Sequence, residues 1–295
     1  MIINYSIIIP HYNTPELLSK CLDSIPKRDD IQIIVVDDKS DEEYIKVLHE
    51  MEILYSNVQF IYSDKKGGGG TARNIGVFHS VGEWMLFSDA DDFFYTDKLS
   101  SLMNKYVKRD NVDVVYLNAK STIEQSDVES EIQPRIRYIL ENRKLSEEEK
   151  KNRVMFETWE PWTRMCRRKL IIKNDIRFDE IPRQNDMYFG LAVSAYATRV
   201  EVEKDFYYCW RQTESSISRK KLDTDSFMNL LQIRYRLDNL YRQRDLDRRT
   251  CFLYYIYLSL KFYGSTFTFH NVIPFLKEKS INPFRGLRHY IIHRS

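Results

Sequence analysis

The chain has 295 residues, and its 45 Lys and Arg residues nearly balance its 43 Asp and Glu residues, giving a formal net charge of +2. This length suits one large domain, or one domain with an appendage. The balanced charge gives no reason to expect nucleic acid as a partner, so any anion site must be local.

The cysteines and apolar runs indicate a cytoplasmic protein that is not integral to a membrane. The run Ile7–Ile9 is too short for the core of a signal peptide. The run Phe252–Leu260 falls well short of the ~20 residues that a membrane-spanning helix needs. No Cys-x-x-Cys pair, and so no sign of a zinc site or disulfide framework, occurs among Cys21, Cys166, Cys209 and Cys251.

Short β-rich runs alternate with helical patterns through the first half of the chain. Nearly apolar strands separated by helices predict an α/β fold, with a mostly parallel central sheet covered by helices on both faces. Ligands of such folds bind beyond the carboxyl ends of the strands. The predicted strands are Tyr5–Ile9, Ile31–Val36, Val58–Tyr62, Glu83–Phe87 and Val112–Tyr116.

Helices are predicted between these strands and in the last part of the chain. One spans Pro15–Ser24 with Thr14 as its N-cap, and another spans Asp41–Met51 with Ser40 as its N-cap. The charge-rich segment Asp127–Lys151 predicts a mobile loop or a surface helix. A C-terminal helical appendage is expected over residues 221–295, where one helix face would carry Phe227, Leu231, Leu237 and Leu240.

Polar loops follow three of the strands, at Pro10–Asn13, Asp37–Ser40 and Ser88–Asp92. An aspartate after a strand is usually a turn former or a helix cap. Here two acidic clusters are expected at one sheet edge, where their carboxylates repel unless a cation or hydrogen-bond donors join them. Oxygen ligands from Asp89 and Asp91 suit Mg²⁺ or Mn²⁺, which keep positions open for phosphate.

Four glycines, Gly67–Gly70, follow the third strand and lead into a helix. Glycines let the backbone pass close to a ligand, and a helix start offers unpaired N–H groups. A loose G-x-G-x-x-A pattern is present, but a dinucleotide-binding pattern follows the first strand of its unit, and no Gly-Lys-Ser/Thr follows for a P-loop. A flexible loop is the alternative.

Together these segments resemble the family 2 glycosyltransferases of the GT-A fold. The matching segments, in order, are Ser6–Asn13, Val35–Ser40, Gly69–Gly76 and Phe87–Asp92. The resemblance is strong over about residues 4 to 95, weaker to about 220 and absent beyond. It implies a catalytic domain over 1–220, with a nucleotide-binding half at 1–110 and an acceptor-binding half at 111–220.

The resemblance also implies the roles of individual residues. Asp38 would meet the nucleotide base, Asp89 would lie by the ribose and metal, and Asp91 would bind the Mn²⁺ or Mg²⁺ ion. The implied metal ligands are therefore Asp91 and Asp89. The implied nucleotide-sugar-binding residues are Pro10, Tyr12, Asn13, Asp38, Gly69, Arg73, Asp89, Ala90 and Arg211.

In the second half, Gln184–Phe189 resembles the family segment that supplies the catalytic base. Asn185 replaces the common glutamate, whereas Asp186 remains and would take the proton of the acceptor hydroxyl. The alternative is a carboxylate favoured by a helix dipole. The implied acceptor-binding residues are Trp162, Asp92 and Asn185, and the alternative for the tryptophan is a place in the core.

The segment Tyr207–Ser218 resembles a final family element, in which Arg211 would neutralise the leaving diphosphate. A surface arginine is the alternative. Because the Gln-x-x-Arg-Trp element of processive synthases is missing, the resemblance implies a non-processive, inverting transferase of the bacterial type. It would move one sugar from a nucleotide-sugar, most commonly a UDP-sugar, to a saccharide or lipid-linked saccharide in cell-surface polysaccharide synthesis.

Two other functions remain as alternatives. A sugar nucleotidyltransferase also uses an α/β sheet and a metal, but places its glycine-rich loop after the first strand. A catalytically silent scaffold of a glycan-assembly complex would not need Asp89, Asp91 and Asp186. The run Cys251–Ser295 mixes aromatic and basic residues, which favours either peripheral contact with the inner face of the plasma membrane or a helical cap on the catalytic domain.

Overall fold

The computed structural model describes residues 2–123, 128–212 and 221–287. The chain divides into two compact units, Met1–Ile217 and Ser218–Ser295. Each unit is described by itself below. The expected roles of residues 1–220 as a catalytic domain and of residues 221–295 as an appendage stay predictions.

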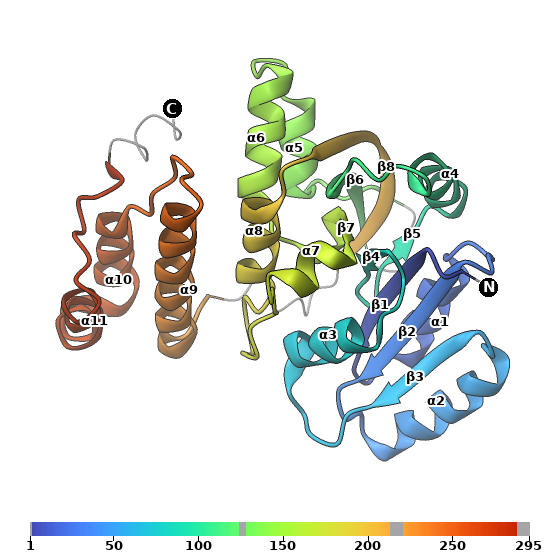
Figure 1. Cartoon of the computed structure of the whole chain (residues 1–295). Coiled ribbons are helices and arrows are strands. Elements are labelled where there is room, and N and C mark those ends of the chain that lie inside the picture. Colours follow the sequence, from blue (N-terminus) through green and yellow to red (C-terminus); the bar gives the residue numbers. More distant parts are fainter. Residues whose placement is uncertain (1, 124–127, 213–220, 288–295) are drawn as a thin grey trace. The chain divides into compact units, whose positions relative to one another are not determined.

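A mixed sheet of eight strands, in the order β3-β2-β1-β4-β7-β6-β8-β5, forms the centre of the first unit (Figure 1). The strand β1 pairs in parallel with β2 and β4, β2 with β3, and β6 with β8. The strands that run the other way are β7, between β4 and β6, and β5, beside β8. The α/β fold and the mostly parallel sheet are thus confirmed. The strands are β1 (Tyr5–His11), β2 (Ile31–Asp37), β3 (Val58–Tyr62), β4 (Trp84–Phe87), β5 (Phe93–Phe94), β6 (Val114–Ile123), β7 (Arg164–Arg167) and β8 (Val200–Gln212).

Helices connect the strands and cover both faces of the sheet. They are α1 (Pro15–Asp23), α2 (Glu42–Leu54), α3 (Gly68–His79), α4 (Thr96–Tyr106), α5 (Arg135–Glu141), α6 (Glu147–Glu157), the 3₁₀ turn η1 (Pro161–Thr163), α7 (Arg168–Lys173) and α8 (Met187–Tyr196). The charge-rich segment expected as a loop or surface helix forms α5 and the start of α6. Its first residue, Asp127, lies outside the described residues.

The N-cap of α2 differs from the sequence prediction. The residue before α2 is Asp41 and not Ser40. The Ser40 hydroxyl donates instead to Asp37 Oδ1 at 2.5 Å, so it is committed to the end of β2. Thr14 is the residue before α1, but its side chain makes no capping hydrogen bond. The prediction of Thr14 as the N-cap residue, with Pro15 at the first helical position, is confirmed, although the threonine hydroxyl is not used. The prediction of Ser40 was wrong by one residue, because Ser40 bonds back to Asp37.

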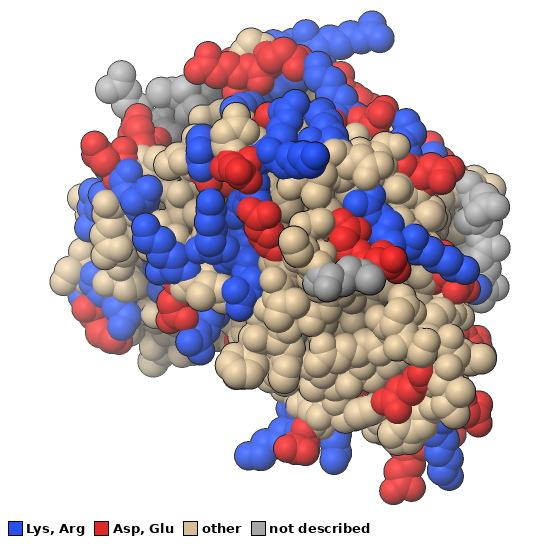
Figure 2. All heavy atoms as spheres, turned by 45° about the vertical axis from the view of Figure 1, so that its right-hand side comes forward, with Lys and Arg blue, Asp and Glu red and all other residues tan. Residues whose placement is uncertain are grey.

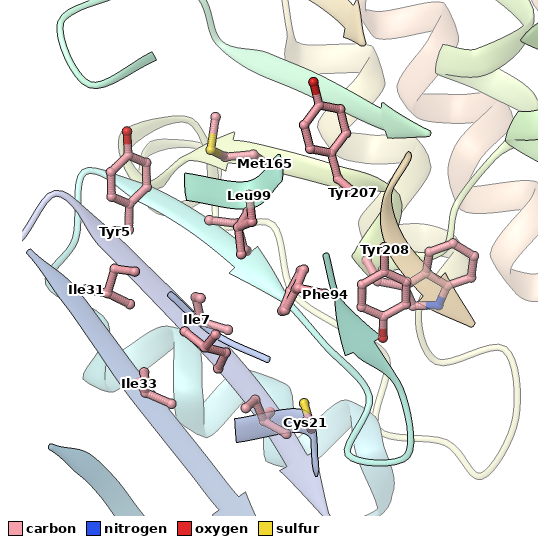
Figure 3. Packing of buried hydrophobic residues seen from close by; sticks show 14 of the residues in the cluster. Tyr5, Ile7, Cys21, Ile31, Ile33, Phe94, Leu99, Met165, Tyr207 and Tyr208 are labelled. Atoms are coloured by element: carbon pink, nitrogen blue, oxygen red, sulfur yellow. The ribbon is translucent and has the colours of Figure 1, made fainter. Parts of the chain in front are cut away.

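The core explains why β1 is apolar along its length. Alternate side chains of a strand point to opposite faces of the sheet. One face carries Ile7, which packs with Ile31 and Ile33 of β2 in the large cluster shown in Figure 3. On the other face, a Cβ atom on Gly76 would lie 2.3 Å from Ile8 Cγ2, so α3 crosses β1 in close contact. Both faces of β1 are therefore buried.

The second unit is helical. Its elements are α9 (Thr224–Gln243), α10 (Phe252–Phe267), the π-helix η3 (Thr268–Val272) and α11 (Ile273–Glu278). Phe227, Leu231, Leu237 and Leu240 are all buried, as their spacing along one face of α9 predicted. Gly264 interrupts α10 with a left-handed φ of 86°. Among the described residues, no helix is both long enough and apolar enough to cross a membrane.

Candidate active site

The ends of β1 and β2 are joined by a buried hydrogen bond between His11 and Asp37. His11 Nδ1 lies 2.8 Å from Asp37 Oδ1, and His11 Nε2 accepts a hydrogen bond from the Thr14 N–H at 3.1 Å. The histidine therefore donates through Nδ1. Burial alone would raise the pKa of Asp37, but the hydrogen bonds from His11 and Ser40 outweigh it and hold the pKa below its ordinary value. The ionised carboxylate is thus satisfied by the protein itself.

Asp38 holds the glycine run in place. Its two carboxylate oxygens accept hydrogen bonds from the backbone N–H groups of Gly67 at 2.7 Å and Gly68 at 2.8 Å. Gly68 has a φ of 82°, a left-handed conformation that favours glycine. A Cβ atom on Gly69 would lie 3.1 Å from Arg73 Nη1. The contact of Asp38 with a nucleotide base stays a prediction, since the described partner is the loop.

The loop after β1 carries an exposed aromatic ring. The Tyr12 side chain is 38% exposed, and Lys66 Nζ lies 3.7 Å from its ring centroid. The next residue, Asn13, has a φ of 54° and exchanges two hydrogen bonds with Asp41, at 2.7 and 2.9 Å. Pro10, half-buried, is paired with Val36 of β2. The loop offers a flat ring beside a cation, which suits stacking on a base.

Arg73 connects three segments that lie far apart in the sequence. Its Nη2 lies 2.5 Å from Asp89 Oδ1, and its Nη1 donates to Asn185 Oδ1 at 3.2 Å. The guanidinium lies 5.5 Å from the ring centroid of Phe178 and is nearly buried. Asn185, which replaces the family's glutamate, thus accepts from Arg73 without adding a negative charge.

The loop after β4 is joined to β8 by hydrogen bonds of the Tyr208 hydroxyl. The Tyr208 hydroxyl donates to Asp92 Oδ2 at 2.7 Å and accepts from the Asp89 N–H at 3.0 Å. The Arg211 N–H donates to Asp92 Oδ1 at 2.7 Å. Burial and then the charges of Asp91 and Asp89 raise the pKa of Asp92 well above its ordinary value. Both Asp92 oxygens are occupied, and its contact with an acceptor stays a prediction.

Two further candidates, Trp162 and Arg211, lie near this loop, and a third, Ala90, is part of it. Trp162 is 7% exposed and stacks on Tyr208, with ring centroids 5.0 Å apart and planes at 10°. This packing agrees with a core tryptophan, and its contact with a sugar stays a prediction. The Arg211 guanidinium lies 5.4 Å from the ring centroid of Phe93, and Ala90 within the loop is buried.

Asp186 stands directly before α8, and its side chain makes no capping hydrogen bond. Its backbone carbonyl accepts from the Gly190 N–H at 2.9 Å, in the first turn of the helix. Burial raises the pKa of Asp186 to about 7, with the positive charge of Arg73 opposing the rise and the negative charge of Glu160 adding to it. A carboxylate with a pKa near 7 is suited to general-base catalysis at neutral pH.

Sequence reasoning did not single out Tyr208 or Glu160. Tyr208 stands inside Tyr207–Ser218, which resembles the family, but the roles of both residues depend on partners distant in sequence. Tyr208 reaches Asp92 across 116 residues. The Trp159 carbonyl approaches Gly190 so closely that a Cβ atom there would lie 2.2 Å away, which sets Glu160 beside the first turn of α8. Local patterns do not reveal either contact.

The described carboxylates at the sheet edge do not by themselves form a complete metal site. Among the residues that the structure describes, no group of three or more His, Cys, Asp or Glu side chains is placed to hold a metal ion. Mg²⁺ and Mn²⁺ at nucleotide sites are usually bound by one or two carboxylates together with substrate phosphates. Asp89 and Asp91 are two carboxylates of one loop, and their charges act together on the buried Asp92. Their binding of a metal ion stays a prediction.

Comparisons with known proteins place this geometry in a family. The family model described as "Glycosyl transferase family 2" matches residues 6–171 of this chain. The poly(ribitol-phosphate) beta-glucosyltransferase of Bacillus spizizenii is 36% identical over 114 residues, covering 37% of this chain and 18% of that protein. The poly(ribitol-phosphate) beta-N-acetylglucosaminyltransferase TarS of Staphylococcus aureus is 23% identical over 239 residues, covering 78% of this chain and 39% of TarS. The chain thus spans less than half the length of either relative.

Solved structures share the fold. TarS residues 1–349 in complex with UDP-GlcNAc match with a TM-score of 0.66 and 22% identity, over 83% of this chain and 68% of that one. A mannosyltransferase from Pyrobaculum calidifontis, in complex with GDP-Man and Mn²⁺, matches with a TM-score of 0.54 and 13% identity, over 97% and 83%. With four motifs at the strand ends and a family match over more than half its length, the chain belongs to glycosyl transferase family 2.

Proposed function

We propose that this chain transfers one sugar, with inversion, from a UDP-sugar to a hydroxyl of a cell-surface glycan. The observation that carries the proposal is Asp186, a buried carboxyl group near Arg73 and Asp89, whose pKa burial raises to about 7. Two relatives are named for modifying poly(ribitol-phosphate), and TarS was solved with UDP-GlcNAc. A phosphate-containing polyol polymer is therefore the proposed acceptor.

The proposed reaction is a single displacement. The Asp186 carboxylate takes the proton of the acceptor hydroxyl as that oxygen forms a bond to the anomeric carbon. The bond from the anomeric carbon to the diphosphate breaks on the opposite side, so the configuration inverts and a nucleoside diphosphate leaves. Arg73 keeps positive charge near Asp186 and Asp89, which favours the ionised form of the base.

Asp89 and Asp91 are the residues that would hold Mn²⁺ or Mg²⁺. When bound, the ion supplies positive charge that stabilises the diphosphate as it leaves. The loop that presents them is fixed by Tyr208 and Asp92, which restrict its movement. Arg211, whose backbone is tied to the same loop, is placed to add positive charge there. The Mn²⁺ of the Pyrobaculum mannosyltransferase supports this assignment.

We propose that the protein acts in the cytoplasm. It would make peripheral contact with the inner face of the membrane, where a lipid-linked acceptor is anchored. The aromatic and basic run Cys251–Ser295 remains a candidate for that contact, and its last residues lie outside the described ranges. Its helices α10 and α11 pack with Phe227 and Leu231 of α9, so part of the run forms the core of the second unit.

A transfer assay tests the proposal. The full chain would be incubated with UDP-GlcNAc or UDP-glucose, poly(ribitol phosphate) and Mn²⁺, and the sugar on the polymer would be measured. Matched reactions would contain EDTA or the Asp186→Asn variant. We expect sugar on the polymer only with metal and intact Asp186. Metal-dependent hydrolysis of the donor without transfer would reject this acceptor, and no donor turnover with UDP-, GDP- or other nucleotide-sugars would favour the scaffold function.

A further inference from the structure

An open groove lies at the edge of the sheet opposite the candidate active site. Ile3 of its lining precedes β1 and Glu83 precedes β4, whereas the loops of the candidate site follow these strands. The other wall includes Lys169, Ile172 and Lys173 of α7. The groove has a volume of about 530 Å³. It is separate from the residues assigned to donor, metal and acceptor.

The lysines of the groove carry uncompensated charge. Over the face shown in Figure 2, basic and acidic side chains are interspersed. In the groove, Lys169 and Lys173 are exposed, and within the described ranges neither forms an ion pair. The acidic residue of the lining, Glu83, accepts from Nη1 of the buried Arg167 and is neutralised there. The groove therefore presents a net positive charge.

Aliphatic side chains stand between these charges. Residues at positions i, i+3 and i+4 share one face of a helix, so Ile172 lies beside Lys169 and Lys173 on the outer face of α7. Its side chain is 49% exposed, and that of Val81, across the groove, is 63% exposed. The surface thus combines flexible cations with apolar groups that face water.

This combination fits an anionic bilayer better than a protein partner. Protein interfaces are depleted in lysine and enriched in aromatic residues and arginine. Lysine stems can instead lie along an apolar surface while their ammonium groups reach lipid phosphates. We propose that the groove docks the protein on a membrane containing anionic phospholipids, with Lys169 and Lys173 at the headgroups and Ile172 and Val81 directed toward the acyl chains.

Docking through this groove would constrain the acceptor. The seven residues of β1 separate the groove from the candidate site, a span of about 20 Å at the rise of a β-strand. This step rests on the proposed function. Transfer would then take place away from the bilayer, so the acceptor hydroxyl must be carried on a chain long enough to extend from the membrane. A polymer meets this requirement, and a single lipid-linked sugar does not.

Vesicle flotation tests the docking. The full chain would be mixed with phosphatidylcholine vesicles with and without phosphatidylglycerol. We expect binding only to the anionic vesicles, and a loss of about tenfold or more in Lys169→Glu/Lys173→Glu. The matched control is Lys20→Glu/Lys46→Glu, which changes the charge equally at exposed sites on α1 and α2. Ile172→Ser keeps the charge and is expected to weaken binding less.

The outcomes separate docking from folding and from catalysis. Donor hydrolysis and transfer to a soluble acceptor are expected to be unchanged in the groove variants, because no donor or base residue is altered. Equal binding by parent and Lys169→Glu/Lys173→Glu, or equal losses in the control variant, would overturn the proposal. So would binding to neutral vesicles, or self-association that depends on the groove lysines. Flotation needs no nucleotide, so it succeeds or fails independently of the proposed reaction.

Discussion

The two acidic clusters at the carboxyl edge of the sheet look alike in sequence but differ physically. The cluster after β2 is satisfied within the protein, since His11 and Ser40 hold the pKa of Asp37 low and two backbone N–H groups bind Asp38. In the cluster after β4, burial and then repulsion by Asp91 and Asp89 raise the pKa of Asp92. A cation from outside would therefore stabilise the second cluster and have little effect on the first.

The largest effect is expected for a change at Asp186, whose pKa is raised in part by the charge of Asp89 in the second cluster. Asp186→Asn keeps the shape and removes the proton acceptor, so transfer should fall by about 10²-fold or more. Donor and metal binding, measured by calorimetry with UDP and Mn²⁺, should survive. Transfer at the parental rate would show that another residue is the base, and Asp179 and Glu180 would be the next candidates. An unfolded variant would make Asp186 a structural carboxylate.

Removing a carboxylate from the second cluster should abolish metal-dependent donor binding. Asp91→Ala deletes a proposed ligand at a half-buried position and should leave the fold intact. Calorimetry with UDP, with and without Mn²⁺, measures the effect. Asp38→Ala is the matched change in the first cluster, and it should weaken UDP binding while the remaining affinity still depends on the metal. Unchanged metal dependence in Asp91→Ala would remove this residue from the site.

The comparison of clusters also predicts unequal effects on stability. Asp37→Asn should lower the free energy of unfolding by about 1–3 kcal/mol, because a satisfied buried charge is lost. Asp92→Asn removes a repelled charge together with one of the two acceptor oxygens used by Tyr208 and the Arg211 N–H, so it should cost less than Asp37→Asn. Urea unfolding in EDTA at pH 7 measures both.

The pH dependence of stability has opposite signs at these two residues. The contribution of Asp37, whose folded pKa is lowered, is present above its unfolded pKa of about 4 and is lost as pH falls through the folded value. Asp92, whose folded pKa is raised, reduces stability as pH rises above about 4. If Asp37→Asn and Asp92→Asn lowered the free energy of unfolding equally, the proposed difference between the clusters would be contradicted.

Much of the donor side could be predicted from sequence because its signals are local. The bounds of β3 were predicted correctly, and β1, β2 and β4 differ by one or two residues. In β1 and β2, continuous β-branched runs reflect burial on both faces, and polar loops follow directly. Family motifs then implied Arg73, Asp89 and Asp186 as site residues, and the structure brings the charges of these three together.

The strand β7 was missed because its sequence resembles an exposed segment. Arg164 and Arg167 flank Met165 and Cys166, yet both arginines are fully buried. The Arg164 guanidinium donates to the carbonyls of residues 158 and 190. The Arg167 guanidinium donates to the carbonyls of residues 109 and 112. Burial of a charge is tolerated only where the fold supplies such partners. No local pattern reveals partners that are supplied from distant segments.

The smallest predicted effect is a shift in the pH dependence of transfer. The base must be ionised, so kcat/KM should rise about tenfold per pH unit below the pKa of Asp186, about 7, and level off above it. Glu160→Gln removes a negative charge that raises this pKa, so the rising limb should move to lower pH. The Asp186→Asn variant should lack the limb altogether, because the titrating group is gone. A limb that stays in place in Glu160→Gln and persists in Asp186→Asn would report another group, such as the donor diphosphate or its metal. The second cluster would then bind the donor without setting the protonation state of the base.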